Sequence, residues 1–417
     1  MKRFRESPGL SFLMPLLLLP LAGVQAQAQP SPDDPLPLDP RVRTGTLENG
    51  LTYFIRENRR PENRAELRLA VNAGSVLETE EQRGLAHLLE HMAFNGTANF
   101  QEQELVEYLE SIGMNFGPEI NAYTSFDETV YMLQVPTDDP EILGTAFQIL
   151  EDWAHQVSLE GEEIDKERGV VIEEWRLGRG ANARMLDEQF PILFQGSRYA
   201  ERLPIGKVEV LESFPHEAIR RFYREWYRPD LMAVIAVGDF DAAQVEETIR
   251  EHFSRLPTPE DARSRTLYDV PGHEETLFAI ASDPEATNSQ VAIMYKREVE
   301  DLNTLAGYRQ LLAERLVTAM LNARLFEISQ QADPPFAAAG TGKGRFVRTS
   351  EFFQLAALVQ DGEIHQGMEA LLVEAERVAR HGFLASELER EKANLLRSLE
   401  QSYAERENQP SAMYANE

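Results

Sequence analysis

The chain of 417 residues carries 41 lysines and arginines against 70 aspartates and glutamates, which gives a formal net charge of −29. An acidic surface of this size argues against nucleic acid or an anionic membrane surface as a partner, because both are negatively charged. The length predicts two or three domains, and the 42% of hydrophobic residues is enough for sizeable cores.

The N-terminus has the pattern of a cleaved signal peptide over residues 1–28. Basic residues at 2–5 precede an apolar run at 10–21, and Ala26-Gln27-Ala28 is a small-x-small cleavage site. The run is too short for a comfortable membrane span, and the chain has no cysteine to carry a lipid. We therefore expect a periplasmic or secreted protein without a membrane anchor, in which residues 29–43 form a mobile leader.

The next part of the chain predicts one α+β domain over residues 44–256. A β-hairpin is expected at 44–56, because Asn49-Gly50 is a strong turn signal between alternating apolar residues. The strand patterns that follow lie at 64–76, 121–135 and 231–237. Helical periodicity is found at 85–94, 102–112, 142–157, 162–177, 215–227 and 242–253, with a loop at 198–206.

A linker is predicted at residues 257–270, and the pattern of strands and helices then restarts. Strand patterns lie at 276–281, 290–295 and 346–360, and helical patterns at 302–329, 367–379 and 386–405. Residues 340–344 are glycine-rich but lack the phosphate-loop spacing, which favours a surface loop. The predicted fold class is α+β, with two related α/β domains, each a mostly antiparallel sheet packed with helices. The second, at 271–417, is expected to be incomplete.

The helix predicted at residues 85–94 carries the strongest chemical signal. His87 and His91 lie four residues apart, so both rings project from one face at a spacing that suits a single zinc ion. Glu90 is close enough to the same face to reach a metal-bound water, and His-x-x-Glu-His is the inverzincin order. Two histidines at this spacing also occur by chance as ordinary packed residues, so the motif needs a third ligand.

The helix predicted at residues 162–177 offers that ligand. Glu167, Val170, Val171 and Glu174 share one face, and two carboxylates on an apolar stripe are costly to bury unless they are paired or bind metal. Glu173 points about 100° away from Glu174. An ordinary charged helix is the alternative explanation.

Together these segments resemble the pitrilysin/insulinase zinc peptidases, which include the mitochondrial processing peptidases. The resemblance runs from about residue 44 to the end of the chain. It rests on residues 84–96, on 121–124 with Thr129 and Tyr131, on Glu167-Arg168 through Glu174, on 199–206, on 222–238 and on 321–325. It implies the processing-peptidase and pitrilysin type of fold.

The resemblance also implies roles for individual residues. His87, His91 and Glu174 would bind one zinc ion per chain, and Glu90 would be the general base that deprotonates the zinc-bound water. Glu167 would be a catalytic-site carboxylate that orients a ligand. Asn121 and Ala122 would lie beside the substrate backbone, although an ordinary edge strand is the alternative for both.

The implied function is that of a zinc-dependent metalloendopeptidase acting on peptides or unfolded protein segments. The alternative is a non-catalytic peptide-binding subunit of a two-subunit peptidase, which the complete motif disfavours. A structural zinc site would need a fourth protein ligand. Arg198-Tyr199 is similar to the family's Arg–Tyr pair but lies in a different segment, so we give it no catalytic role. We expect this chain to be the first half of a longer enzyme, with a further C-terminal region or a partner subunit closing the chamber.

Overall fold

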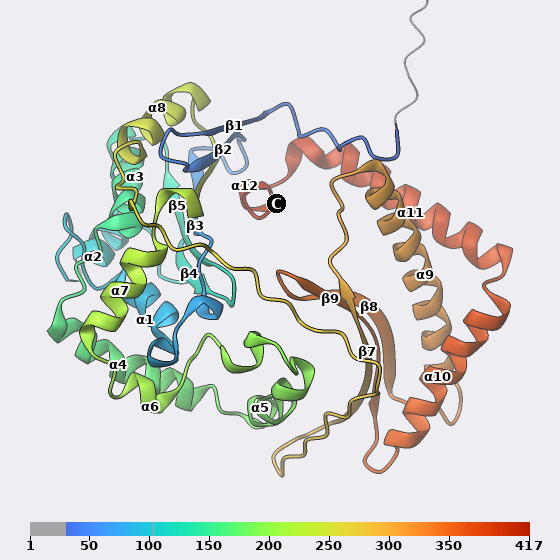
Figure 1. Ribbon diagram of the computed structural model, residues 1–417. Helices are drawn as coiled ribbons and strands as arrows, with labels where there is room; N and C mark the ends of the chain where they lie inside the picture. Colours follow the sequence, from blue (N-terminus) through green and yellow to red (C-terminus); the bar gives the residue numbers. More distant parts are fainter. Residues whose placement is uncertain (1–30, 103) are drawn as a thin grey trace, which may run out of the picture.

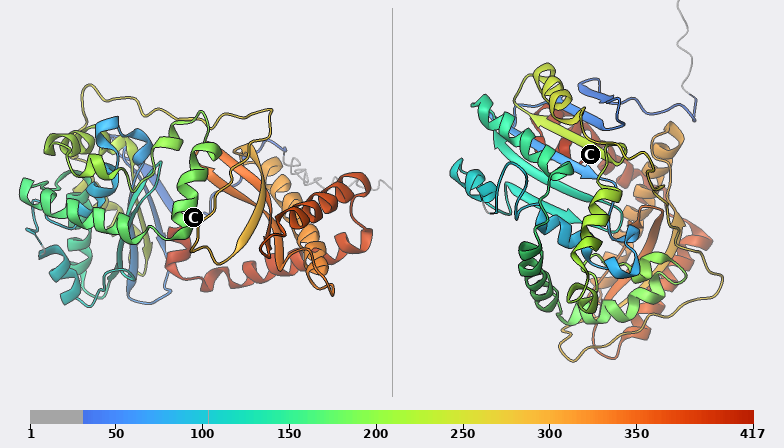
Figure 2. Two further views of the ribbon diagram at one scale, coloured as in Figure 1. Left: turned by 90° about the horizontal axis from the view of Figure 1, so that it is seen from below. Right: turned by 60° about the vertical axis from the view of Figure 1, so that its left-hand side comes forward.

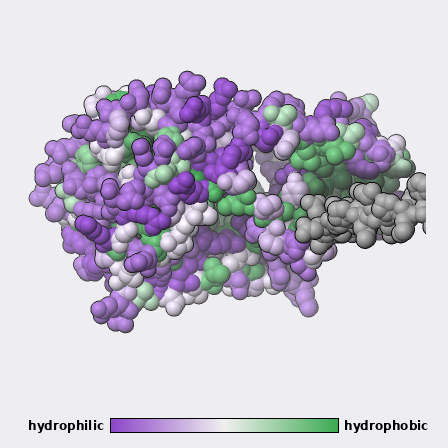
Figure 3. All heavy atoms as spheres, turned by 90° about the horizontal axis from the view of Figure 1, so that it is seen from above, coloured by the Kyte–Doolittle hydropathy of each residue, from purple (hydrophilic) through white to green (hydrophobic). Residues whose placement is uncertain are grey.

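The computed structural model describes residues 31–102 and 104–417, so the predicted signal peptide at 1–28 lies outside the described residues (Figure 1). Two α/β units lie side by side, as Figure 1 and the left-hand view of Figure 2 show. Hydrophilic residues dominate the upper face of the molecule, in agreement with the net charge (Figure 3). Within the described residues, no helix has the length and apolar character to cross a membrane.

The first unit contains a six-stranded sheet in the order β1-β2-β6-β3-β5-β4. Its strands are β1 (Val42–Thr46), β2 (Thr52–Glu57), β3 (Arg64–Val71), β4 (Ile120–Thr124), β5 (Thr129–Pro136) and β6 (Met232–Gly238). All neighbours are antiparallel except β2 and β6. The mostly antiparallel sheet and the β1–β2 hairpin are therefore confirmed. Strand β4 is an edge strand, since β5 is its one partner among the described residues.

Helices bury the apolar faces of this sheet. They are α1 (Leu85–Met92), α2 (Glu104–Ser111), α3 (Pro140–His155), α4 (Gly161–Leu177), α5 (Ala181–Leu193), α6 (Val208–Leu211), α7 (His216–Trp226) and α8 (Ala242–Phe253). Helices α3 and α8 contact the sheet on the outer side of the unit (Figure 1). The buried cluster beneath the helices draws its residues from the whole stretch between Leu47 and Leu256, and it also includes Val347. The helical patterns of the sequence thus mark real helices, but they do not predict α5 and the short α6.

The second unit contains a three-stranded antiparallel sheet in the order β7-β9-β8. Its strands are β7 (Ser289–Glu298), β8 (Ala338–Val347) and β9 (Ser350–Val359), and its helices are α9 (Leu305–Ser329), α10 (Ile364–His381) and α11 (Ala385–Glu405). Its own buried cluster is small and consists of Leu321, Leu325, Phe336, Leu355, Ala357, Val359 and Leu371.

Three strand and loop predictions are wrong. Residues 121–135 form the two strands β4 and β5 rather than one, because Ser125 N–H donates to Glu128 C=O (2.8 Å) and closes a tight turn. That turn has Phe126-Asp127 at its centre, which is not a typical turn pair. Residues 276–281 alternate like a strand but pair with no described strand, and the side chains of Phe278 and Ile280 are 72% and 82% exposed.

The predicted surface loop at 340–344 lies within β8 instead. Glycine suits this strand because an aromatic ring of β9 lies directly over it. A Cβ atom added at Gly344 would come within 2.5 Å of Phe352 Cζ. Glycine at position 344 is therefore compatible with a strand, because the Phe352 ring occupies the space that a side chain would take.

Among the described residues, the leader, the β8–β9 hairpin and a C-terminal helix join the two units, as does an ion pair between Arg184 and Asp283. The leader is bound rather than mobile, because Leu36 N–H donates to Asn303 C=O (2.6 Å) and Leu305 N–H donates to Asp34 C=O (3.1 Å). The tip of the β8–β9 hairpin inserts Val347 into the core of the first unit. Helix α12 (Ser411–Ala415) lies against β3 and β6 of the first sheet. The domain boundaries given above, at 44–256, 257–270 and 271–417, stay a prediction.

Candidate metal centre

Helix α1 presents its two histidines on the side opposite its apolar face. Leu85, Leu88, Leu89 and Met92 are buried in the core of the first unit. The rings of His87 and His91 keep part of their surface exposed, and their centroids lie 4.7 Å apart in an edge-to-face arrangement. The amphipathic pattern of the helix thus fixes which way both imidazoles point.

The start of α1 is set by a buried carboxylate. Both Glu78 oxygens accept from Gly84 N–H (3.1 Å each), and Oε1 also accepts from Ala86 N–H (2.8 Å). Complete burial raises the pKa of Glu78 to about 8, against these hydrogen bonds. Gly84 has φ +103° and lies against Gly206, where an added Cβ would come within 2.3 Å of Gly84 Cα. The helix can begin here only because both positions are glycine.

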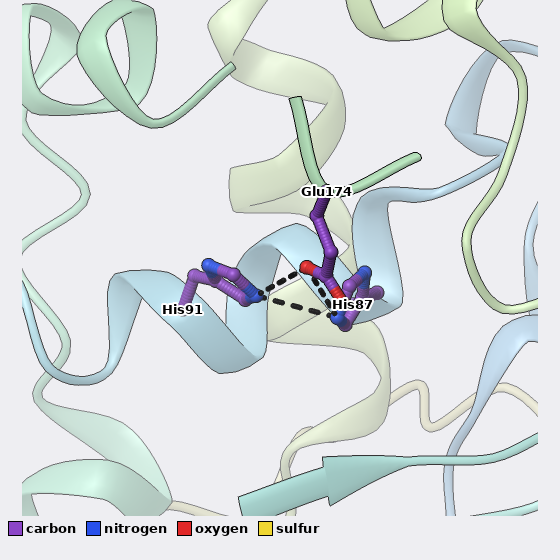
Figure 4. Close-up of side chains that lie close together, drawn as sticks. All are labelled: His87, His91 and Glu174. Atoms are coloured by element: carbon purple, nitrogen blue, oxygen red, sulfur yellow. Dashed lines mark hydrogen bonds and ion pairs between the residues drawn. The ribbon is translucent and has the colours of Figure 1, made fainter. Parts of the chain in front are cut away.

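Helix α4 brings a carboxylate to the two histidines (Figure 4). Glu174 Oε2 lies 3.6 Å from His87 Nε2 and 3.4 Å from His91 Nε2, and the two ring nitrogens are 3.3 Å apart. Within the described part of the chain, these three residues form the one group of histidines and acids whose possible ligand atoms all lie within 4.8 Å of one another.

This triangle of donor atoms fits a tetrahedral metal ion. With metal–ligand bonds of about 2.0–2.2 Å, neighbouring ligand atoms of a tetrahedron are about 3.3–3.6 Å apart. The three measured separations fall in this range. Two imidazoles and one carboxylate also form a donor set typical of catalytic zinc.

The His91 ring is held at its Nδ1 atom by two successive hydrogen bonds. Glu167 Oε1 lies 2.8 Å from His91 Nδ1, and Asn95 Nδ2 donates to Glu167 Oε2 (2.6 Å). Burial opposes a charged ring, but the Glu167 carboxylate raises the pKa of His91. The pKa of Glu167 is lowered despite burial, because His91 and Asn95 both bond to its carboxylate. These contacts turn His91 Nε2 towards Glu174.

The His87 ring has a different environment. Burial, followed by the neighbouring His91, lowers the pKa of His87 to about 4. Its Nδ1 atom is buried and has no hydrogen-bond partner among residues 31–102 and 104–417. The ring is therefore neutral near pH 7, and a neutral imidazole has a lone pair available for a metal.

Glu90 lies beside this triangle but outside it. Its side chain is buried, and Thr124 Oγ1 of β4 donates to its Oε2 (2.6 Å). Burial raises the pKa of Glu90, while the hydrogen bond from Thr124 opposes the shift. Glu90 is thus a buried carboxylate next to His91 in the sequence, and it is not one of the three close donors.

The other residues discussed in the sequence analysis lie on an edge strand, in the loop that follows α5 and on α4. Asn121 and Ala122 are both on the edge strand β4, and Asn121 Oδ1 accepts from Ala122 N–H (2.9 Å). Tyr199 is buried and donates to Asp127 (2.9 Å), while Arg198 Nε donates to Val76 C=O (2.6 Å). Arg198 and Tyr199 therefore both bond to other parts of the first unit. Val170 is half exposed and is not part of the apolar face predicted for α4.

Sequence reasoning missed three residues that support the site, namely Glu78, Asn95 and Thr124. Glu78 lies seven residues before the start of α1, outside the positions at which a helix-start signal is expected, so no local rule identifies it. The contacts of Asn95 and Thr124 link elements that are distant in the sequence, so no local pattern could have identified them.

Two family models match the chain. Residues 53–184 match the model described as insulinase (peptidase family M16), and residues 213–395 match the peptidase M16 inactive domain. The chain belongs to the M16 peptidase family. The family resemblance seen in the sequence is thus confirmed.

Curated members of the M16 family are similar over most of this chain. A zinc protease PQQL-like protein of Arabidopsis thaliana is 40% identical over 374 residues, which cover 89% of this chain and 36% of that protein. The probable zinc protease PqqL of Escherichia coli (strain K12) is 32% identical over 364 residues, which cover 87% of this chain and 39% of that protein. The chain therefore spans less than half the length of these relatives.

A solved structure shows the same fold. The first half of the periplasmic protease PqqL from Escherichia coli superposes with a TM-score of 0.83 at 28% identity, covering 92% of this chain and 82% of that one. The match to the complete PqqL structure has the same score and covers 42% of that chain. The predicted α+β, pitrilysin-like fold class and the likeness to the first half of a longer enzyme are confirmed.

Proposed function

We propose that this protein is a zinc-dependent metalloendopeptidase that hydrolyses peptides or unfolded protein segments. The observation that carries the proposal is the triangle of donor atoms from His87, His91 and Glu174, with the buried carboxylate of Glu90 beside it. The zinc protease names of the relatives support the same activity.

One zinc ion is proposed to be held by His87 Nε2, His91 Nε2 and Glu174 Oε2. Bound there, zinc supplies Lewis-acid chemistry, which polarises the scissile carbonyl and makes water a stronger nucleophile. The low pKa of His87 keeps its ring neutral for this purpose. Glu167 accepts from His91 Nδ1 and thereby holds the ring in one tautomer and orientation.

Glu90 is proposed to be the general base. Its carboxylate takes a proton from the attacking water and then gives a proton to the leaving amine. Burial favours this role, because a carboxyl group with a raised pKa accepts a proton more readily than an exposed one.

The substrate backbone is proposed to pair with the free edge of β4. This edge has no strand partner among the described residues, so an extended peptide can add to the sheet there. The Ala122 N–H that now donates to Asn121 Oδ1 could then donate to a substrate carbonyl. Alternate side chains of the peptide would point towards α1, which packs next to β4.

We also propose a periplasmic or secreted location. The basic, apolar and small-residue pattern of residues 1–28 supports it, as does the periplasmic protease among the similar structures. A second half, either a further region of the protein or a partner subunit, is proposed to close the chamber, since the relatives are more than twice as long as the matched region.

The test compares wild type with Glu90→Gln in the complete gene product, including any residues encoded beyond Glu417. Glu90→Gln should keep zinc and peptide affinity, because the three donors remain, while turnover falls by roughly the 10²–10⁴-fold that a positioned base contributes. Glu173→Gln changes a neighbouring carboxylate of α4 that bonds to Arg176 instead of the two histidines; it is the matched control and should behave like wild type. Near-normal turnover of Glu90→Gln would refute the mechanism, and peptide binding without hydrolysis by wild type would support the binding-subunit alternative.

A further inference from the structure

The side chain of Glu90 is held by one partner. Thr124 Oγ1 donates to Glu90 Oε2 at 2.6 Å, and no other described side chain bonds to this carboxylate. A distance of about 2.5–2.7 Å is typical of a hydroxyl bonded to a charged oxygen, which is stronger than a neutral hydrogen bond. The other oxygen, Glu90 Oε1, accepts no hydrogen bond from the described residues. It is also not one of the polar atoms of these residues that are completely buried without a partner. One oxygen of Glu90 is thus fixed, and the other is available.

Thr124 is itself held in place by the sheet. It is the last residue of β4 and pairs with Thr129 of β5, whose hydroxyl donates to Ala73 C=O (3.0 Å). A hydroxyl has one proton to donate, and Thr129 donates its proton to Ala73. The two threonine hydroxyls lie 3.4 Å apart, and the proton of Thr124 remains available for Glu90. A β-branched side chain on a strand is also stiff at χ1, which limits the directions open to the hydroxyl.

The turn that follows Thr124 is fixed by groups from three other parts of the chain. Asp127 accepts from Tyr199 OH (2.9 Å), from Arg265 Nη2 (2.9 Å) and from Arg348 N–H (3.1 Å). The aspartate is buried, so these bonds are shielded from water. The end of β4 therefore cannot shift without breaking several buried contacts.

We propose that Thr124 is a positioning residue for the general base: its hydroxyl holds Glu90 Oε2 so that Oε1 faces the reacting water. This inference rests on the proposed function, since it needs Glu90 to act as the base. A carboxylate at the end of a flexible side chain samples several rotamers, and only some of them place an oxygen within hydrogen-bond reach of the attacking water. The hydrogen bond from Thr124 limits the rotamers of Glu90 already in the folded protein. No side-chain entropy of Glu90 then has to be lost during the reaction.

The test uses Thr124→Val, which keeps the shape of the side chain and removes the hydroxyl. In the complete protein, kcat per zinc-loaded molecule should fall by roughly 10–100-fold, below the 10²–10⁴-fold contribution of the base itself. KM and zinc content should stay within about twofold of wild type, because neither the edge of β4 nor the three donors change. Thr124→Ser, which restores the hydroxyl, should recover most of kcat.

Two further variants separate positioning from a general loss of structure. Thr129→Val removes the neighbouring hydroxyl, which does not bond to Glu90, and should leave kcat per zinc-loaded molecule within about twofold of wild type. In a Glu90→Gln background, adding Thr124→Val should lower turnover by less than about twofold, because residues that act as a unit are not additive. Thermal unfolding of each variant shows whether it is folded, and Thr124→Ala replaces the valine variant if that one is not.

The outcomes distinguish this inference from the proposed function. Near-normal turnover of Glu90→Gln would overturn the proposed function and this inference with it. If Glu90→Gln is impaired but Thr124→Val keeps wild-type kcat, the positioning role of Thr124 alone is wrong. An equal loss from Thr124→Val in both backgrounds would also overturn it, since Thr124 would then act independently of Glu90.

Discussion

The two units of the molecule have unequal cores. In the first unit, six strands and the helices around them bury one continuous apolar cluster that includes Trp153 and Trp226. In the second unit, three strands and three helices bury a cluster of seven residues in the described chain. Part of its β8–β9 hairpin is buried in the first unit instead, through Val347.

This difference explains where the candidate site lies. Its side chains come from α1, α4 and β4, which all belong to the first unit. Three donor atoms can be kept about 3.3–3.6 Å apart only if the elements that carry them are rigid, and rigidity follows from dense packing. The second unit, with its thinner core, contributes an anchor for the β4–β5 turn through Arg348 but none of the three donors.

Trp153→Ala should destabilise the larger hydrophobic core, which is that of the first unit. The Trp153 side chain is fully buried, and its indole N–H donates to Ala93 C=O (2.8 Å) at the end of α1. Removing a buried tryptophan should lower the free energy of unfolding by about 3–5 kcal/mol. Because α1 loses an anchor, zinc affinity should fall as well. Denaturant unfolding and metal titration would measure both effects, and unchanged zinc affinity would argue against packing as the source of the geometry.

Leu371→Ala should affect the weaker core and leave the site intact. Leu371 is fully buried in the small cluster of the second unit. The loss should lie near the lower end of the usual range for leucine, about 2–3 kcal/mol, since a thin core can relax around the gap. Hydrogen exchange should rise in α9 and α10, while zinc content stays at the wild-type level. Loss of zinc in this variant would show that the second unit supports the site more directly than its contacts indicate.

The parts of the fold that could be predicted are those with local signals. The Asn49-Gly50 hairpin and the helix containing His87 and His91 follow from spacing and turn chemistry over a few residues. Residues 276–281 have an alternating strand pattern but pair with no strand in the described part of the chain, because pairing depends on distant residues. The turn at Phe126-Asp127 lacks typical turn residues because tertiary contacts of Asp127 hold it.

In the candidate site, too, only the local part of the arrangement could be predicted from the sequence. The four-residue spacing brings His87 next to His91 on any helix. No local rule connects them with Glu174, which was selected by its resemblance to a known family and does lie with them in space. The hydrogen bonds of Asn95 and Thr124 depend on how α1, α4 and β4 pack together, so they became visible only in the structure. The metal-binding and catalytic roles themselves stay a prediction.

The central claim is that His87, His91 and Glu174 bind zinc, and a comparison of two neighbouring glutamates tests it most directly. Glu174 lies at the donor triangle, whereas Glu173, the residue before it, accepts from Arg176 Nη1 (2.8 Å). Zinc content and affinity would be measured for wild type, Glu174→Gln and Glu173→Gln. We predict about one zinc per chain in wild type and Glu173→Gln, and a loss of affinity in Glu174→Gln of at least roughly the 10–100-fold known for residues that merely orient a ligand. Full zinc binding by Glu174→Gln together with loss of zinc by Glu173→Gln would contradict the account.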